Sequence, residues 1–400
     1  MENEKKVEEK AVQRGEKNAF FRFLARKDTV FSGKRYGIDA LGAMALGLFG
    51  SLLIGTIFSA LGMIPYLGFL ATVGGWAKAV SGPAMAVAIA YALKAPPLVL
   101  YSAAAVGYAA NIASSASGFL AAAAGEGLKA SGGSGGPLAV LLIAIVAVEC
   151  GKAVSKETKV DILVTPFVTI LVGGGLAMLT APYISVAVDV IGTFIGWATY
   201  WQPFLMGLIV SVVVGIALTL PISSAAICAA IGLSGITALA AGHAPDVVQG
   251  YALAGGAAIA GCCAQMVGFA VMSFYENRWS GLVSQGLGTS MLQMPNIIRN
   301  PRIWIPPTVA SATTGPLATC VFKLQMYGAP INSGMGTCGM LGPIGLILGW
   351  FDESYPAAVG AWDWIGLVLI CLILPAVISW ALCLLLRRIG WIRAGDLKLE

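Results

Sequence analysis

The side chains that could do chemistry in this 400-residue chain are mostly uncharged amides and hydroxyls, with a single histidine among them. His243 follows a broken apolar segment and stands three residues before Asp246. Because an imidazole changes its charge near neutral pH, His243 could hydrogen-bond a solute or handle a proton. The alternative is a residue at the end of an interfacial loop that has no chemical role.

The amides are the second set of candidates. Gln265 lies well inside an apolar run over residues 247–274, and a buried amide needs partners, so it either ties two helices together or lines a solute pathway. Pro and Gly interrupt the stretch 288–307, whose amides suit sugar-like hydroxyl groups, and 328–337 forms a second irregular turn. Ordinary interfacial loops are the alternative for both stretches. The residues predicted to bind a small polar solute are Ser223, Ser224, His243, Gln265, Thr289, Ser290, Gln293, Asn296 and Asn332.

Other chemistries are not expected from this sequence. The Gly-rich loop at 131–136 is followed by Pro137, whereas a phosphate-binding P-loop needs Lys and Ser or Thr after its last glycine. The eight cysteines nearly all fall in apolar runs, without a Cys-x-x-Cys pair or a nearby histidine, which indicates small buried residues. We therefore expect no metal, no cofactor, no disulfide framework and no catalytic residue.

The elements that position these side chains must lie mostly in a bilayer. Only 11% of the residues are charged, whereas a soluble domain carries roughly 25%. This composition argues against a soluble enzyme, a nucleic-acid-binding protein and a disordered scaffold. Residues 1–36 hold ten Lys/Arg against six Asp/Glu, and residues 387–400 hold four against two. The positive-inside rule therefore predicts that both termini are cytoplasmic, which requires an even number of crossings.

Apolar runs of about 20 residues, the length of a spanning helix, divide the chain into two unlike halves. The first half keeps its polar residues mostly at the ends of five runs. The second half alternates clear spans with apolar segments that Pro, Gly and amides break. Such broken segments are tolerated only inside protein or beside a water-filled cavity, and they form substrate sites in transporters. The runs lie near 38–64, 73–93, 98–124, 138–150, 162–179, 204–220, 247–274 and 364–386.

The stretch from Gly288 to Pro307, with the later Asn332-Ser333-Gly334-Met335-Gly336-Thr337, resembles the IIC membrane component of the bacterial sugar phosphotransferase system. It is most similar to the stand-alone branch that includes perfringolysin-regulator-like membrane proteins. The resemblance covers most of the chain from about residue 35. It implies an all-α polytopic protein of the bacterial cytoplasmic membrane, with about ten transmembrane helices, two re-entrant hairpins and an amphipathic linker helix. It also implies a homodimer that works as an elevator-type transporter.

This resemblance divides the chain into five expected parts. A scaffold and dimerisation domain comes first in the membrane, and the amphipathic linker joins it to a transport domain that binds the solute. Two hairpins, near 221–241 and 280–303, belong to the transport domain. The parts are a cytoplasmic tail (1–36), the scaffold of five helices (37–182), the linker (183–202), the transport domain (203–386) and a second cytoplasmic tail (387–400).

One departure from the family bears on function. In sugar IIC proteins a Glu-Pro pair in the second hairpin supplies the glutamate that holds the sugar hydroxyl to be phosphorylated. Here the corresponding stretch reads Gly288-Thr289-Ser290-Met291-Leu292, without a carboxylate. We therefore expect transport of a small polar, sugar-like solute without phosphorylation by this chain.

Two alternatives to plain transport stay open. One is a membrane sensor that uses the same pocket to regulate gene expression, with residues 1–36 recruiting a cytoplasmic regulatory protein. The other is a true sugar phosphotransferase component that needs separate IIA and IIB phosphocarrier partners.

Overall fold

The computed structural model describes residues 26–29, 32–33, 35–62, 66–129, 135–220, 224–356 and 358–399. Within those ranges the chain forms helices joined by turns, with no β-strand. Most of the predicted N-terminal tail, most of the Gly-rich loop at 131–136 and the candidate Ser223 lie outside the described residues. The all-helical architecture agrees with the predicted fold class.

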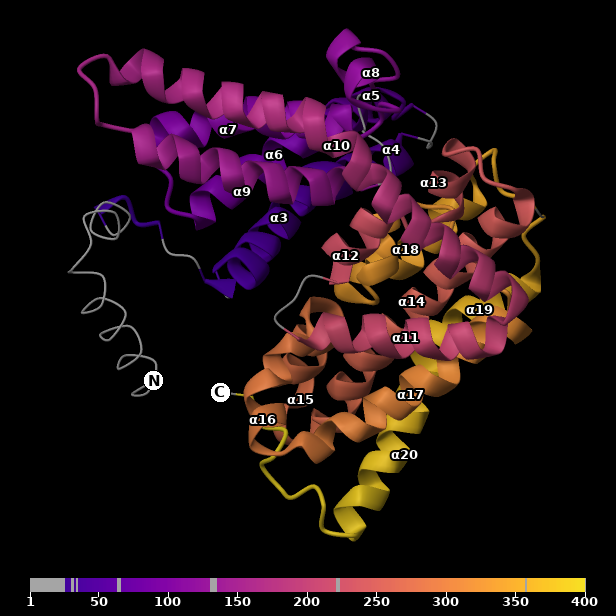
Figure 1. Ribbon diagram of the computed structural model, residues 1–400. Coiled ribbons are helices and arrows are strands. Elements are labelled where there is room, and N and C mark those ends of the chain that lie inside the picture. The colour runs from indigo at the N-terminus through magenta and orange to yellow at the C-terminus, as the bar shows by residue number, and fades with distance from the viewer. Residues whose placement is uncertain are drawn as a thin grey trace.

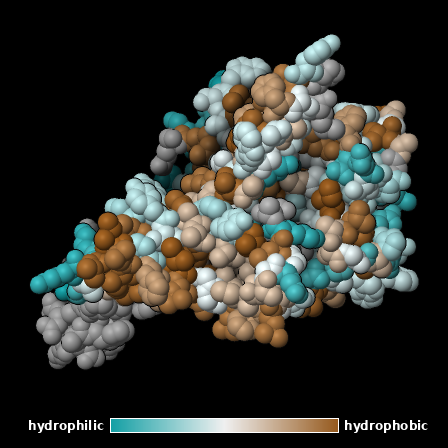
Figure 2. Space-filling view, turned by 90° about the horizontal axis from the view of Figure 1, so that it is seen from above, coloured by the Kyte–Doolittle hydropathy of each residue, from teal (hydrophilic) through white to brown (hydrophobic). Residues whose placement is uncertain are grey.

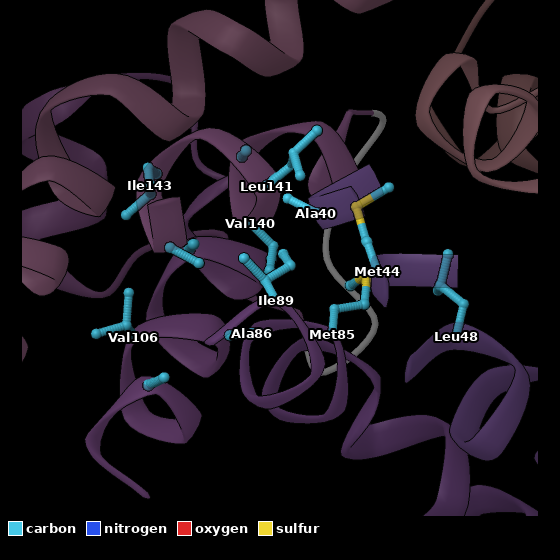
Figure 3. Close-up of a cluster of buried hydrophobic side chains, with 14 of the residues drawn as sticks. Ala40, Met44, Leu48, Met85, Ala86, Ile89, Val106, Val140, Leu141 and Ile143 are labelled. Carbon is cyan, nitrogen blue, oxygen red and sulfur yellow. The ribbon is translucent and has the colours of Figure 1, made fainter. Parts of the chain in front are cut away.

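A first group of helices packs around a buried apolar cluster (Figures 1 and 3). Met44, Met85 and Val140 come from three different helices of the group and belong to this one cluster, with Met44 and Met85 near each other in Figure 3. Two helices of the group approach closely at Gly82 and Gly107, where a Cβ on either residue would meet the opposite main chain. The group comprises α3 (Ala40–Leu48), α4 (Ile54–Leu61), α5 (Phe69–Ala79), α6 (Ser81–Ala92), α7 (Pro97–Ala113), α8 (Phe119–Ala124) and α9 (Gly136–Val154).

The long helix α10 (Asp161–Trp201) runs from the first group of helices to the second (Figure 1). Its 41 residues form one helix that continues through Pro182. The sequence instead predicts a spanning run that ends near 179 and a separate amphipathic linker helix within 183–202. A proline is tolerated inside such a helix when neighbouring helices pack on it.

The glycines of α10 are the places where other helices approach. A Cβ at Gly173 would collide with Val106 of α7. A Cβ at Gly192 would collide with the ring of Tyr251, which belongs to the second group. Tertiary packing therefore keeps the helix continuous across a sequence that, taken locally, predicts a break.

A second group of helices surrounds α14 (Pro245–Met272), most of which is buried. Its other helices are α11 (Pro203–Thr219), α12 (Ser224–Ile231), α13 (Gly235–Ala240), α15 (Phe274–Val283), α16 (Met294–Arg299), α17 (Ile305–Pro316), α18 (Leu341–Trp350), α19 (Ala361–Val368) and α20 (Leu374–Arg388). Short 3-10 or π-helical turns join them: η3 (Ser284–Gly288), η4 (Ser290–Gln293), η5 (Pro301–Trp304), η6 (Leu317–Val321), η7 (Pro330–Gly334), η8 (Cys338–Met340) and η9 (Leu369–Ile373). Close contacts on α14 fall at glycines, as at Gly261, where a Cβ would meet the main chain of Ser211 in α11.

The surface of the protein suits a lipid environment. Five helical stretches within the described ranges are long and apolar enough to cross a membrane, and shorter apolar helices lie beside them. Large aromatic and aliphatic side chains of α10, such as Phe167 and Phe194, point outward. Broad apolar areas beside smaller polar patches are visible in Figure 2. These features are those of a polytopic membrane protein. The five stretches are Arg35–Ser59, Gly136–Val154, Asp161–Trp201, Pro245–Met272 and Ala361–Arg388.

Candidate functional site

Two broken segments meet within the second group, and side-chain hydroxyls bond across their contact. The first segment is the α12–α13 pair, and the second is the segment that contains η7. Ser224 Oγ donates to the carbonyl oxygen of Gly334 at 2.6 Å. In the other direction, Ser333 Oγ donates to the carbonyl oxygen of Leu233 at 2.7 Å. The predicted site residue Ser224 thus holds the two segments together.

Two buried oxygens near this contact have no hydrogen-bond partner in the described part of the chain. Asn332, in η7, is 1% exposed and leaves its Oδ1 unpartnered. Thr337, five residues later, is also 1% exposed and leaves its Oγ1 unpartnered. Because nearly all buried polar atoms in proteins are hydrogen-bonded, two such oxygens on one irregular segment indicate a place for a ligand's donors. Sequence analysis selected Asn332 but missed Thr337, although both belong to the same polar stretch.

A cavity of about 600 Å³ lies beside this contact, between the first group, α10 and the α12–α13 pair. Ala329 and Pro330, directly before the rest of η7, form part of its wall. Cavities of 300–1,000 Å³ hold small-molecule ligands, and hydroxyl-bearing walls suit a solute with several hydroxyl groups. The polar side chains of the wall are Ser114, Ser115, Lys129, Ser185, Asp189 and Thr237.

His243 lies in the turn between α13 and α14 and contacts α10. Its Nε2 is 3.0 Å from Asp189 Oδ1. The imidazole also stacks on the ring of Tyr251, with 5.8 Å between the ring centroids. Since Asp189 lines the cavity, His243 positions one of the few charged groups that a solute would meet there.

Gln265 is fully buried in α14 and bonds to neighbouring helices. Its Oε1 accepts from Trp304 Nε1 at 2.9 Å and from Thr219 Oγ1 at 3.3 Å. The hydroxyl of Thr219 also lies 2.9 Å from Ser290 Oγ. Of the two roles considered for Gln265, these contacts are those of a tie between helices.

Gln293 and Asn296 bond to the C-terminal segment that follows α20. Gln293 Nε2 donates to the carbonyl oxygen of Leu397 at 3.0 Å, and Asn296 Nδ2 donates to that of Lys398 at 2.9 Å. The two amides also bond to each other, from Asn296 Nδ2 to Gln293 Oε1 at 2.8 Å. Side chains that the sequence favours for sugar hydroxyls therefore bind the chain's own main chain in this structure.

The predicted site residues thus fall into separate hydrogen-bonding groups. Two of them belong to the segments that meet beside the cavity, and one positions a carboxylate of the cavity wall. The other described ones lie in the helix tie, in the contact with the C-terminal segment, or, for Thr289, in a cap that accepts from Met291 N at 3.2 Å, whereas Ser223 lies outside the described residues. Ser224 and Asn332 belong to the segments that meet beside the cavity, and His243 positions the carboxylate of the cavity wall. Gln265 and Ser290 belong to the helix tie, and Gln293 and Asn296 belong to the contact with the C-terminal segment.

Charged groups play a small part in this half of the protein. Glu276 Oε1 accepts from Arg387 Nη2 at 2.6 Å, which ties α15 to α20. In the described ranges no group of three or more His, Cys, Asp or Glu side chains is placed to hold a metal ion. The polar side chains that line the cavity and its neighbouring segments are mainly hydrogen-bonding groups without charge.

Comparison with known proteins places the chain in a family. The family model described as "Phosphotransferase system, EIIC" matches residues 38–399, which include both helical groups and α10. No curated protein matches the chain. The family match and the apolar helices identify a multi-pass bacterial membrane protein, and components of this kind usually work with separate IIA and IIB phosphocarriers. The chain therefore belongs to the EIIC family of the phosphotransferase system, whose members are its sugar-transporting membrane components.

Proposed function

We propose that this protein carries a sugar-like solute across the membrane without phosphorylating it itself. The observation that carries the proposal is the pair of oxygens, Asn332 Oδ1 and Thr337 Oγ1, that are buried without partners in the described part of the chain; their segment lies beside the 600 Å³ cavity, whose walls they do not themselves line. A buried polar group without a partner costs ~1–3 kcal/mol. Hydroxyl donors of a bound sugar would remove that cost, so binding is favoured at this place.

The walls of the cavity support a neutral, hydroxylated solute. Four hydroxyl groups line it, and its one acid and one base, Asp189 and Lys129, balance in charge. Asp189 is further engaged by His243. A charged solute would leave an unbalanced charge in this site. The hydroxyl groups of a sugar can instead exchange hydrogen bonds with the donors and acceptors of the walls.

The second hairpin supports transport without phosphorylation. Its turn carries Thr289 and Ser290 where the resemblance leads one to expect a sugar-binding glutamate. Both hydroxyls serve the fold, because Thr289 Oγ1 accepts from a main-chain N–H and Ser290 Oγ bonds to Thr219. The carboxylate in the helix leading into this hairpin, Glu276, is paired with Arg387.

We also propose how the protein moves. Residues 37–182 form a scaffold that pairs with a second copy, and residues 203–386, with hairpins near 221–241 and 280–303, move as an elevator. Both termini stay in the cytoplasm. The continuous helix α10, whose residues 183–201 make up nearly all of the expected linker (183–202), packs on both helical groups and acts as the arm between them (Figure 1). The cavity lies at the junction that such a motion would open and close.

The test is uptake of radiolabelled sugars and polyols into proteoliposomes that contain the full chain and no phosphoryl donor. We expect uptake, and a fall of about tenfold in Thr337→Val and in Asn332→Leu, since each variant loses a hydrogen bond to the solute. The matched control is Ser379→Ala, which removes another buried, unpartnered hydroxyl from α20 and should leave uptake unchanged.

Two outcomes would count against different parts of the proposal. Equal uptake by Thr337→Val, Asn332→Leu and the natural protein would reject the site. Sugar that enters only as a phosphorylated product, and only with added phosphocarrier proteins, would reject transport without phosphorylation while leaving the site intact.

A further inference from the structure

A second cavity, of about 390 Å³, lies where four helices of the membrane part begin or end. α6 and α9 end beside it, and α7 and α10 begin beside it. Because α9 and α10 are long and apolar enough to cross a membrane, their neighbouring ends place the cavity near one surface of the membrane. Its lining residues are Arg26, Lys27, Asp28, Lys94, Pro96, Lys152, Ser155, Lys156 and Glu157.

The cavity is basic, because five of its lining side chains are cations and two are carboxylates. The carboxylates are already engaged. Lys27 Nζ lies 2.6 Å from Glu157 Oε1 and its hydrogen bond lowers the pKa of that carboxyl. The Arg35 guanidinium donates to Asp28 at 2.9 Å and holds the pKa of that carboxyl below its usual value.

Lys152 forms the floor of the cavity and is 1% exposed. Its Nζ donates to the carbonyl oxygens of Asp28 and Leu93, at 2.9 and 3.1 Å, and pairs with Glu149 at 3.1 Å. A buried ammonium that is held in this way fixes the N-terminal segment against the ends of α6 and α9. The cavity is therefore a built structure and not a chance gathering of mobile side chains.

Lys94 and Lys156 are the cations of the cavity that remain available. Both are exposed, and within the described ranges neither ammonium group makes a hydrogen bond or a close ion pair, although Lys94 interacts at longer range with Asp28 and Lys156 with Asp161. Each stands two residues after the end of its helix in the left-handed region, with φ of +56° and +62°. Glycine is the usual residue at such a position, and another residue costs roughly 1–2 kcal/mol there. The two strained positions bring two lysines to the same cavity.

We propose that this cavity binds a phosphate-bearing anion, and that the headgroup of an anionic phospholipid is its ligand. Lys94 and Lys156 supply the ammonium groups that meet the phosphate, as basic pockets between membrane helices do. The first turn of α10 adjoins the cavity through Asp161, which accepts from the main-chain N–H of Lys156 at 2.7 Å. In the same turn Ile162 and Leu163, 71% and 70% exposed, offer an apolar surface for acyl chains. This surface favours a lipid over a free phosphate ester.

The experiment titrates the purified full chain in detergent with short-chain phosphatidylglycerol and follows the midpoint of thermal unfolding. The same titration is run with phosphatidylcholine, inorganic phosphate and glucose 6-phosphate. We expect phosphatidylglycerol to bind and phosphatidylcholine not to bind. Lys94→Gln and Lys156→Gln should each weaken the apparent affinity about fivefold, since one lysine near a lipid headgroup contributes about 1 kcal/mol.

The chain offers a matched control in Lys323, another exposed lysine with a left-handed backbone, at φ +47°, outside the cavity. Lys323→Gln removes the same charge from the same kind of backbone and should leave binding unchanged. Stabilisation by inorganic phosphate or the sugar phosphate alone, lost in the two cavity variants, would support the anion site with a free phosphate ester as its ligand. Equal affinity in the Lys94, Lys156 and Lys323 variants, or equal binding of phosphatidylcholine, would overturn the proposal.

Discussion

Two irregular parts of the second helical group look alike in sequence but use their polar side chains in opposite ways. In the hairpin from η3 to α16, Gln293 and Asn296 bond to each other and to main-chain carbonyl oxygens. In the segment around η7, Asn332 Oδ1 and Thr337 Oγ1 are buried without partners in the described structure. Both parts combine Pro and Gly with polar side chains that include an amide. Hydrogen-bond partners, and not composition, separate the hairpin that is a structural unit from the segment that is a candidate ligand site.

The C-terminal segment after α20 accounts for this difference. Ile392 and Leu397 are buried in an apolar cluster that also contains Phe269 of α14. This anchoring turns main-chain carbonyl oxygens toward the hairpin, and Leu397 O accepts from Asn277 Nδ2 at 2.7 Å as well as from Gln293. In Figure 1 the C-terminus accordingly lies beside α15 and α16.

Among the changes that test this comparison, removal of the C-terminal segment should cause the largest loss of stability. Truncation before Trp391 would expose the apolar surface that Ile392 and Leu397 cover and leave the hairpin amides without their carbonyl partners. We expect a loss of ~5 kcal/mol in the free energy of unfolding, from two buried aliphatic side chains and at least two buried amides. Denaturant unfolding in detergent micelles measures it. Lys398→Gln, which keeps the main chain, is the control, and a truncated chain as stable as this control would contradict the anchoring role.

Replacement of one hairpin amide should have a smaller but still large effect. Gln293→Leu keeps the size of the side chain but removes its bonds to Gln285 Oε1, Leu397 O and Asn296 Nδ2, and it leaves the buried Gln285 Oε1 without its partner, whereas the other two groups keep a second bond. We expect the free energy of unfolding to fall by ~3 kcal/mol, because buried groups that lose a partner cost ~1–3 kcal/mol each. The same unfolding experiment measures the change, with Met291→Leu as a control in the same hairpin. A loss below about 1 kcal/mol would show that these bonds are not what holds the hairpin.

Much of the helical framework follows from the sequence because it depends on local runs of apolar residues. The runs at 204–220 and 247–274 correspond to α11, Pro203–Thr219, and α14, Pro245–Met272. The burial of Gln265 also follows from its place within an apolar run. In these cases the apolar run in the sequence and the structural feature that it predicts occupy the same residues.

The features that sequence analysis missed depend on contacts between distant residues. α10 continues through Pro182 because helices pack on its glycines, and Gly192 meets Tyr251, 59 positions later. Gln293 and its acceptor Leu397 are 104 positions apart. Residue type alone predicts that an amide is valuable in a membrane, but only the fold determines whether its partner is a solute or a main-chain carbonyl.

The contact between His243 and Asp189 tests whether α10 is firmly fixed to the second group. Their side chains are 17% and 31% exposed, and partly solvated pairs contribute little to stability. His243→Phe keeps an aromatic ring against Tyr251 but removes the bond to Asp189, so we expect a loss of ~0.5 kcal/mol in the free energy of unfolding. His243→Gln, which retains a donor but not the ring, separates stacking from hydrogen bonding. If His243→Phe lost more than about 2 kcal/mol, the contact would fix α10 firmly to the second group. A helix that connects two moving groups should not be fixed in this way.

The smallest expected change in stability is at Thr337, and it is the sharpest contrast with Gln293. Thr337→Val replaces an unpartnered hydroxyl by a methyl group of similar size, so no partner is left behind. We expect the free energy of unfolding to stay within about 1 kcal/mol of the natural value, or to rise slightly. A fall of about 2 kcal/mol or more would mean that the hydroxyl serves the fold, as the amides of the hairpin do. Stability that is preserved while solute uptake falls would separate a binding group from a structural one at the level of a single oxygen atom.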